Sequence, residues 1–172
     1  DTDTLVVIGL TGITMLFVAG AKMRHIGLIG LLAIIFLACI VLARPYAKQR
    51  VMTYLNPNND PQGSSYQIQQ SLIAIGSGGL TGRGFGQSIQ KFSYLPEPVG
   101  DSIFAVAAEE FGFIGMFIML CLYLFFVQRT FKIAARAPDT FSRLVVLGIG
   151  ILVVVESFMN ISAMLGVIPL TG

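Results

Sequence analysis

The sequence predicts an all-α integral membrane protein in which apolar helices alternate with polar loops. Hydrophobic residues make up 55% of its 172 residues and charged residues only 12%, which lies outside the usual balance of a soluble domain. The charges are also clustered, because long stretches carry none and the segments between them carry nearly all, as when membrane spans alternate with loops. The net charge of +2, without a basic face that carries aromatic residues, argues against nucleic-acid binding.

Four apolar stretches are long enough to cross a bilayer, which needs about 20 residues and tolerates about 17 to 25. They cover approximately residues 5–21, 26–43, 103–127 and 144–165. Only residues 22–25 join the first two, which are therefore expected to form an antiparallel hairpin in a single membrane domain. Lysine and arginine near the span ends favour a cytoplasmic position for this turn and for loop 128–143. Loop 44–101 is then exterior, although it also holds basic residues mixed with acidic ones.

Loop 44–101 is the informative region, because a structureless loop of this length in a compact protein is usually functional. Residues 56–63 are a dense set of turn formers. Residues 66–75 predict a short amphipathic helix that lies on the membrane surface or re-enters it, with Ile68, Leu72 and Ile75 on its apolar face. Six glycines then follow between residues 76 and 86, and they predict a mobile hinge.

Two other interpretations of this loop fail in their details. The glycines lack the Lys-Ser/Thr ending of a nucleotide-binding P-loop, although a glycine-lined surface near a lipid diphosphate stays open. The turn segment 56–63 supplies oxygen ligands like those of a calcium loop, but Gln67 stands where the twelfth-position glutamate is needed. His25 is the only histidine and lies in a short basic turn, where a solvated position or one facing lipid headgroups is expected, which argues against a histidine-based catalytic triad in this chain.

Carboxylates at helix positions are the candidate functional groups. Asp101 stands directly before an apolar span, where capping of the helix is the simplest interpretation. Glu109 and Glu110 follow about two turns later, roughly 12 Å deeper along a helix, and carboxylates at such depth predict a functional polar track. Glu156 lies near the middle of the fourth span with Asn160 on the same face, which predicts a buried structural carboxyl.

Five stretches share their order and spacing with a known protein family. They are DPQGSSYQ at 60–67, QSLIAIGSGGL at 70–80, GFGQSIQK at 84–91, YLPE at 94–97 and DSIFAVAAEEFG at 101–112. Together they resemble the SEDS family of peptidoglycan glycosyltransferases (FtsW, RodA and SpoVE), and its division branch FtsW most closely. The chain departs from the family pattern at Val99-Gly100, where the family has His-Thr, at Ser102, where it has Phe, and at Glu156, where it has Gln.

The resemblance implies a fold of about ten transmembrane helices, of which this chain holds the sixth to the ninth. It also implies that the full protein polymerises lipid II, with undecaprenyl diphosphate as the leaving group and Asp101 as the general base. The expected substrate-binding residues are Gln67, Arg83, Lys91, Glu97, Glu109 and Glu110. Cations must neutralise the diphosphate, and Lys91, Arg83 or a divalent metal ion (Mg²⁺ or Mn²⁺) are open alternatives.

The same resemblance implies a place in the bacterial cytoplasmic membrane and a set of partners. These are lipid II, the growing glycan strand, a class B penicillin-binding transpeptidase and other membrane proteins of the divisome or elongasome. Two other functions stay open, because intramembrane carboxylates and glycines also occur in lipid flippases and transporters. The alternatives are a lipid II flippase and a scaffold without catalytic activity. This fragment alone is expected to be inactive.

Overall fold

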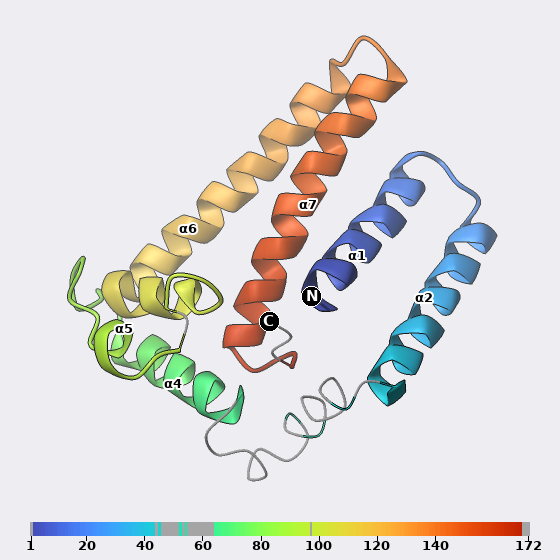
Figure 1. Ribbon diagram of the computed structural model, residues 1–172. Helices are drawn as coiled ribbons and strands as arrows, with labels where there is room; N and C mark the ends of the chain where they lie inside the picture. Colours follow the sequence, from blue (N-terminus) through green and yellow to red (C-terminus); the bar gives the residue numbers. More distant parts are fainter. Residues whose placement is uncertain are drawn as a thin grey trace. The chain divides into compact units, whose positions relative to one another are not determined.

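The described part of the chain is entirely helical. The computed structural model describes residues 2–43, 45, 52, 54, 64–96 and 98–169, and no strand occurs among them. The helices are α1 (Thr2–Val18), α2 (Met23–Ala43), α4 (Ser64–Ser77), α5 (Gln90–Ser93), α6 (Ile103–Ala135) and α7 (Thr140–Met164) (Figure 1). Three of them, α2, α6 and α7, are long and apolar enough to cross a membrane. The all-α membrane fold is thus confirmed, with α1, at 17 residues, at the short end of the spanning range.

The chain divides into two compact units. The first comprises residues 1–48, 123–157 and 171, and the second comprises residues 49–122, 158–170 and 172. Helices α6 and α7 contribute to both, and each unit is described separately below.

In the first unit, α1 and α2 form the predicted hairpin (Figure 1), but the helix ends differ from the predicted ones. Gly20 has φ 83°, and the Ala21 N–H donates to the Leu16 carbonyl at 3.0 Å. This arrangement is a Schellman C-cap, which ends a helix at a left-handed glycine. The connecting turn therefore lies at residues 19–22 rather than 22–25, because apolar residues near position 20 belong to the turn and not to the helix.

The rest of the first unit consists mainly of the end of α6, the start of α7 and the turn between them. Helix α6 continues to Ala135, so the first half of the predicted loop 128–143 is helical. The two helices approach closely at Gly150, where an added Cβ would lie only 2.5 Å from Thr130 Cγ2. Polar residues at the end of an apolar span therefore extend the helix here instead of ending it.

The second unit has a small core made by four segments. Its buried residues are Ala74, Leu95, Ala105, Val106 and Met164. The predicted helix at 66–75 is confirmed as α4. Ile68 and Ile75 of its predicted apolar face pack against the core, whereas Leu72 is 45% exposed. The inner face also carries small residues, among them Ser71, whose hydroxyl donates to Met164 Sδ at 3.2 Å. Small residues let α4 approach the end of α7 closely.

Helix α6 contains a break that the sequence did not predict. Gly112 has φ 64° and ψ −168°, which is not a helical conformation. Residues 113–135 alone measure about 34 Å at about 1.5 Å per residue, enough for a hydrocarbon core of about 30 Å. The predicted depth of Glu109 and Glu110 assumed that one straight helix runs from Asp101 through the span. The break at Gly112 separates both glutamates from residues 113–135, so distance along the helix from Asp101 no longer gives their depth in the membrane.

Candidate functional site

The glycine-rich loop after α4 inserts its backbone into the break in α6. In an unbroken helix the carbonyls of Glu109 and Glu110 would accept hydrogen bonds from N–H groups four residues later. Here the Arg83 N–H donates to the Glu109 carbonyl at 3.0 Å, and the Gly84 N–H donates to the Glu110 carbonyl at 3.0 Å. The loop thus supplies the two donors that the break at Gly112 removes.

The two N–H groups freed on the other side of the break find acceptors in the same loop. The Phe113 N–H donates to the Gly79 carbonyl at 2.9 Å, and the Ile114 N–H donates to the Leu80 carbonyl at 3.0 Å. Four backbone groups of α6 are therefore satisfied by residues 79–84. Such pairing is needed wherever irregular backbone lies away from water, because an unpaired buried peptide group is costly.

Three glycines make this insertion sterically possible. A Cβ at Gly78 would collide with the Ala108 carbonyl, one at Gly82 with the Glu110 carbonyl, and one at Gly112 with the Gly82 nitrogen. Gly82 also has φ 79°, where other residues are strained. These glycines serve close backbone packing rather than the mobile hinge expected from the sequence.

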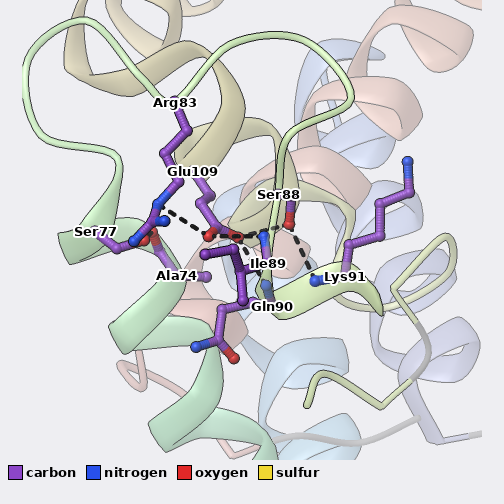
Figure 2. A network of polar contacts seen from close by, with 8 residues as sticks. All are labelled: Ala74, Ser77, Arg83, Ser88, Ile89, Gln90, Lys91 and Glu109. Carbon is purple, nitrogen blue, oxygen red and sulfur yellow. Dashed lines mark hydrogen bonds and ion pairs between the residues drawn. The ribbon is translucent and has the colours of Figure 1, made fainter. Parts of the chain in front are cut away.

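Glu109 fastens the next part of the loop to α6. Its side chain is fully buried, and Figure 2 shows it at the centre of a polar cluster. Oε2 accepts hydrogen bonds from the Ser88 hydroxyl at 2.6 Å and the Gln90 N–H at 3.3 Å, while Oε1 accepts from the Ile89 N–H at 3.2 Å. Arg83 Nε lies 3.3 Å from Oε1. The carboxylate therefore caps α5 together with the Ser88 hydroxyl, which accepts from the Lys91 N–H at 3.0 Å, and is fully partnered.

Arg83 and Lys91, the two candidate cations, differ in their surroundings. Their side chains are 38% and 34% exposed. Arg83 is tied to Glu109, whereas Lys91 Nζ lies 4.0 Å from Glu110 Oε1, which has no hydrogen-bond partner among the described residues. In Figure 2 the Arg83 side chain points toward the end of α4 and Lys91 points away from Glu109. Lys91 is therefore the less committed of the two cations.

Asp101 lies in a turn just before α6, with an exposed side chain. Its carboxylate makes no hydrogen bond or ion pair with any residue that the structure describes, but its backbone carbonyl accepts a hydrogen bond from Asn160 Nδ2 at 2.9 Å. The next residue, Ser102, is fully buried. The Ser102 hydroxyl donates to the Pro96 carbonyl at 3.0 Å and accepts from Gln67 Nε2 at 3.1 Å. A fixed backbone thus presents a free carboxylate.

Asp139, at the start of α7, differs from Asp101 because both of its carboxylate oxygens accept hydrogen bonds. Its Oδ2 accepts from the Ser142 N–H and its Oδ1 from the Ser142 hydroxyl, both at 2.8 Å. These two bonds, the backbone one first, hold the pKa of Asp139 below its usual value. Its side chain is a helix cap.

The predicted site residues therefore fall into two groups. Arg83, Lys91, Glu109 and Glu110 gather where the loop meets α6, and Gln67 joins Asp101 through Ser102. Glu97 lies outside the described residues. Glu156 is exposed rather than buried as the sequence suggested.

Sequence reasoning missed the contacts of two serines. Ser88 bonds to Glu109 in the first group, and Ser102 bonds to Gln67 in the second. A buried carboxylate needs several donors, and a hydroxyl within the GFGQSIQK stretch was an available signal for Ser88. Within the described residues, no three His, Cys, Asp or Glu side chains gather as metal ligands. They therefore do not form a metal centre by themselves, and the expected divalent cation stays a prediction.

Comparison with known proteins decides the family. All 172 residues match the family of FtsW, RodA and SpoVE, described as Cell cycle protein. The chain belongs to this family. Its SEDS resemblance is thereby confirmed.

Relatives in three bacteria carry three different names. The chain is 45% identical to Stage V sporulation protein E of Bacillus subtilis and 41% identical to peptidoglycan glycosyltransferase MrdB of Escherichia coli K12, covering all of this chain and 47% of each relative. It is 37% identical to the probable peptidoglycan glycosyltransferase FtsW of Geobacter sulfurreducens, covering all of this chain and 46% of that protein. This family member thus spans about half the length of its relatives, and the identities do not single out the FtsW branch.

A solved structure shows the same fold. It belongs to a peptidoglycan synthase complex described as coordinating polymerization and crosslinking. This family chain superposes on it with a TM-score of 0.71 and 29% identity, over all of this chain and 47% of the solved one. The fold of this chain is therefore that of about half of one chain of this complex.

Proposed function

We propose that the full protein is a peptidoglycan glycosyltransferase that polymerises lipid II, with Asp101 as the general base. The observation that carries the proposal is the exposed Asp101 carboxylate, which makes no hydrogen bond or ion pair with any described residue while its backbone is held by Asn160. Two relatives named as peptidoglycan glycosyltransferases support the reaction class. A carboxylate that is not engaged elsewhere can accept a proton from substrate.

The proposed reaction joins two lipid-linked sugars. A sugar hydroxyl on one molecule attacks the anomeric carbon of the other, forming a new glycosidic bond while the bond to undecaprenyl diphosphate breaks. Asp101 takes the hydroxyl proton, and the diphosphate leaves with the electron pair of the broken bond. Positioned general bases contribute roughly 100-fold to 10,000-fold to such steps.

Lys91 is the proposed cation for the leaving diphosphate. Within the described residues its Nζ lies 4.0 Å from Glu110 Oε1 and 5.4 Å from the centre of the Phe92 ring. Its side chain is 34% exposed, so the ammonium is available to an incoming anion. Arg83 keeps its Nε on Glu109 and holds the loop, which leaves it a secondary role toward substrate. A cation placed where charge develops stabilises the transition state.

The proposed location is the bacterial cytoplasmic membrane, with residues 44–101 exterior and the turns near Lys22 and Arg136 cytoplasmic. The distribution of lysine and arginine supports this orientation. A class B penicillin-binding transpeptidase is the proposed partner, together with other divisome or elongasome proteins, because the solved relative belongs to a synthase complex. Labelling of single cysteines at Ser64 and Thr140 with an impermeant reagent tests the orientation. Reaction at Thr140 but not Ser64 in intact cells would reverse it.

The test of function uses the purified full-length protein in vesicles that present lipid II. We expect glycan polymer without added transpeptidase. Movement of lipid II between leaflets without polymer would instead identify a flippase, and neither activity would identify a scaffold.

A further inference from the structure

The backbone at Asp101 is not fixed by the helix that follows it. Helix α6 begins at Ile103, and residues 98–102 form a turn. Asp101 therefore precedes the regular hydrogen-bond ladder of α6. One local bond spans this turn, from the Ile103 N–H to the Gly100 carbonyl at 3.3 Å, and tertiary contacts add to it.

One such contact comes from α7, 59 residues along the chain. Asn160 Nδ2 donates to the Asp101 carbonyl at 2.9 Å. Asn160 lies one turn before Met164, whose side chain is fully buried and accepts the Ser71 hydroxyl at 3.2 Å. The end of α7 is thus anchored in the core, and Asn160 reaches Asp101 from a rigid position.

A second contact holds the other side of the same peptide. Ser102 is fully buried between its donor, Gln67, and its acceptor, the Pro96 carbonyl. The peptide between residues 101 and 102 is therefore held at its carbonyl oxygen by α7 and at the following side chain by α4 and the preceding loop. Movement of the Asp101 backbone relative to the end of α7 would therefore break the Asn160 bond.

We propose that Asn160 is a positioning residue that acts through Asp101, a role that rests on the function proposed above. Its amide fixes the carbonyl of Asp101 and so the direction in which the free carboxylate points. A displacement of about 1 Å at a reacting group can cost about 100-fold in rate. Loss of this single donor is therefore expected to reduce kcat without removing a contact to substrate.

The test measures lipid II polymerisation by the full-length enzyme. Asn160→Ala deletes the donor, and Asn160→Leu deletes it while filling the space. We expect kcat to fall about 10-fold to 100-fold in both, with KM within about twofold of wild type. Asn160→Gln, which keeps an amide donor, should retain more activity than Asn160→Leu.

Ser157→Ala is the matched control. Ser157, three residues before Asn160, also bonds from α7 to α6, with its hydroxyl 2.8 Å from the Tyr123 hydroxyl. Its loss should lower the melting temperature about as much as Asn160→Ala and leave kcat near wild type. An equal fall in kcat for both variants would show that Asn160 only stabilises the helix pair, and would overturn the proposal.

A double-mutant cycle separates this inference from the proposed function. In an Asp101→Asn background, Asn160→Leu should cause no further fall in kcat, because its effect passes through Asp101. A full multiplicative loss there would overturn the positioning role. Wild-type kcat in Asn160→Leu, with an inactive Asp101→Asn enzyme, would refute the positioning role alone. Wild-type turnover of Asp101→Asn would refute the proposed base itself.

Discussion

Helices α6 and α7 each follow an aspartate, yet the two aspartates are used differently. Asp139 lies directly before Thr140, the first residue of α7, and both of its oxygens accept hydrogen bonds from Ser142. Asp101 lies one residue farther from its helix, which begins at Ile103, and among the described residues its carboxylate has no partner. One position relative to the helix start separates a cap from a free carboxylate.

The wider surroundings of the two helix starts differ in the same way. The start of α7 is held by a local bond between residues three apart. The first turns of α6 are held by distant segments, namely the glycine loop, the contacts that converge on Glu109, and Asn160. Substitutions should therefore be costly around α6 and mild at the start of α7.

The largest loss of stability is expected from Gly82→Ala. The added Cβ would collide with the Glu110 carbonyl, and the residue would keep φ 79°. The cost should be about 3 kcal/mol or more, seen as a loss of folded protein in a detergent melting assay. Gly86→Ala is the control, because Gly86 has φ 75° but nothing within 4 Å of its Cβ position. Equal losses in both variants would mean that the inserted loop adds no steric requirement.

An intermediate loss of stability is expected from Glu109→Gln. The amide cannot accept from all the donors that converge on the buried carboxylate, so at least one buried donor loses its partner, at a cost of about 1 to 3 kcal/mol. Glu110→Gln is the control, since Glu110 Oε1 has no hydrogen-bond partner in the described part of the chain and Lys91 is 4.0 Å away. A melting temperature unchanged by Glu109→Gln would contradict the anchoring role.

The functional polar track that the sequence predicted at these two glutamates stays a prediction. For Glu109 we expect the Gln variant to affect stability more than activity, because its carboxylate is fully partnered within the fold. For Glu110 we expect the opposite, because its Oε1 is buried next to the partly exposed Lys91. Comparing kcat and melting temperature of the two Gln variants sharpens this distinction.

The smallest loss of stability is expected from Asp139→Ala, which removes the exposed side chain that caps α7. Because the folded state lowers the pKa of Asp139, its stabilisation is present above the unfolded-state pKa and is lost as pH falls through the lower folded-state value. The difference in melting temperature between wild type and variant should therefore be present at pH 7 and shrink in acid, below about pH 4. A difference in melting temperature that grows as the pH falls would contradict this prediction.

The helices were predictable from the sequence because apolar length and family motifs are local signals. The ends of the helices were less predictable. At Gly20, for example, a left-handed glycine ends α1 within an apolar run. The break at Gly112 was not predictable, because it is stabilised by bonds to residues 79–84, about 30 positions earlier. The glycines themselves were visible, but their function as packing positions depends on that distant partner.

The candidate site was predictable in its residue types and only partly in their roles. Asp101 was chosen as a candidate through its family motif. Its position alone favoured a helix cap, but that interpretation depends on the exact helix start, which a sequence places only within one or two residues. Gln67 was expected to bind substrate, which stays a prediction, and its bond to the Ser102 hydroxyl was not foreseen. Such roles depend on hydrogen bonds across α4, α6 and α7, which no local pattern specifies.

The central claim is that the free aspartate at α6 acts on substrate and the capping aspartate at α7 does not. The most direct test compares lipid II polymerisation by folded full-length Asp101→Asn and Asp139→Asn enzymes with wild type, with melting temperatures measured on the same samples. We expect Asp101→Asn to melt like wild type and turn over about 100-fold more slowly or worse, while Asp139→Asn keeps wild-type turnover. Wild-type turnover by well-folded Asp101→Asn enzyme would contradict the account.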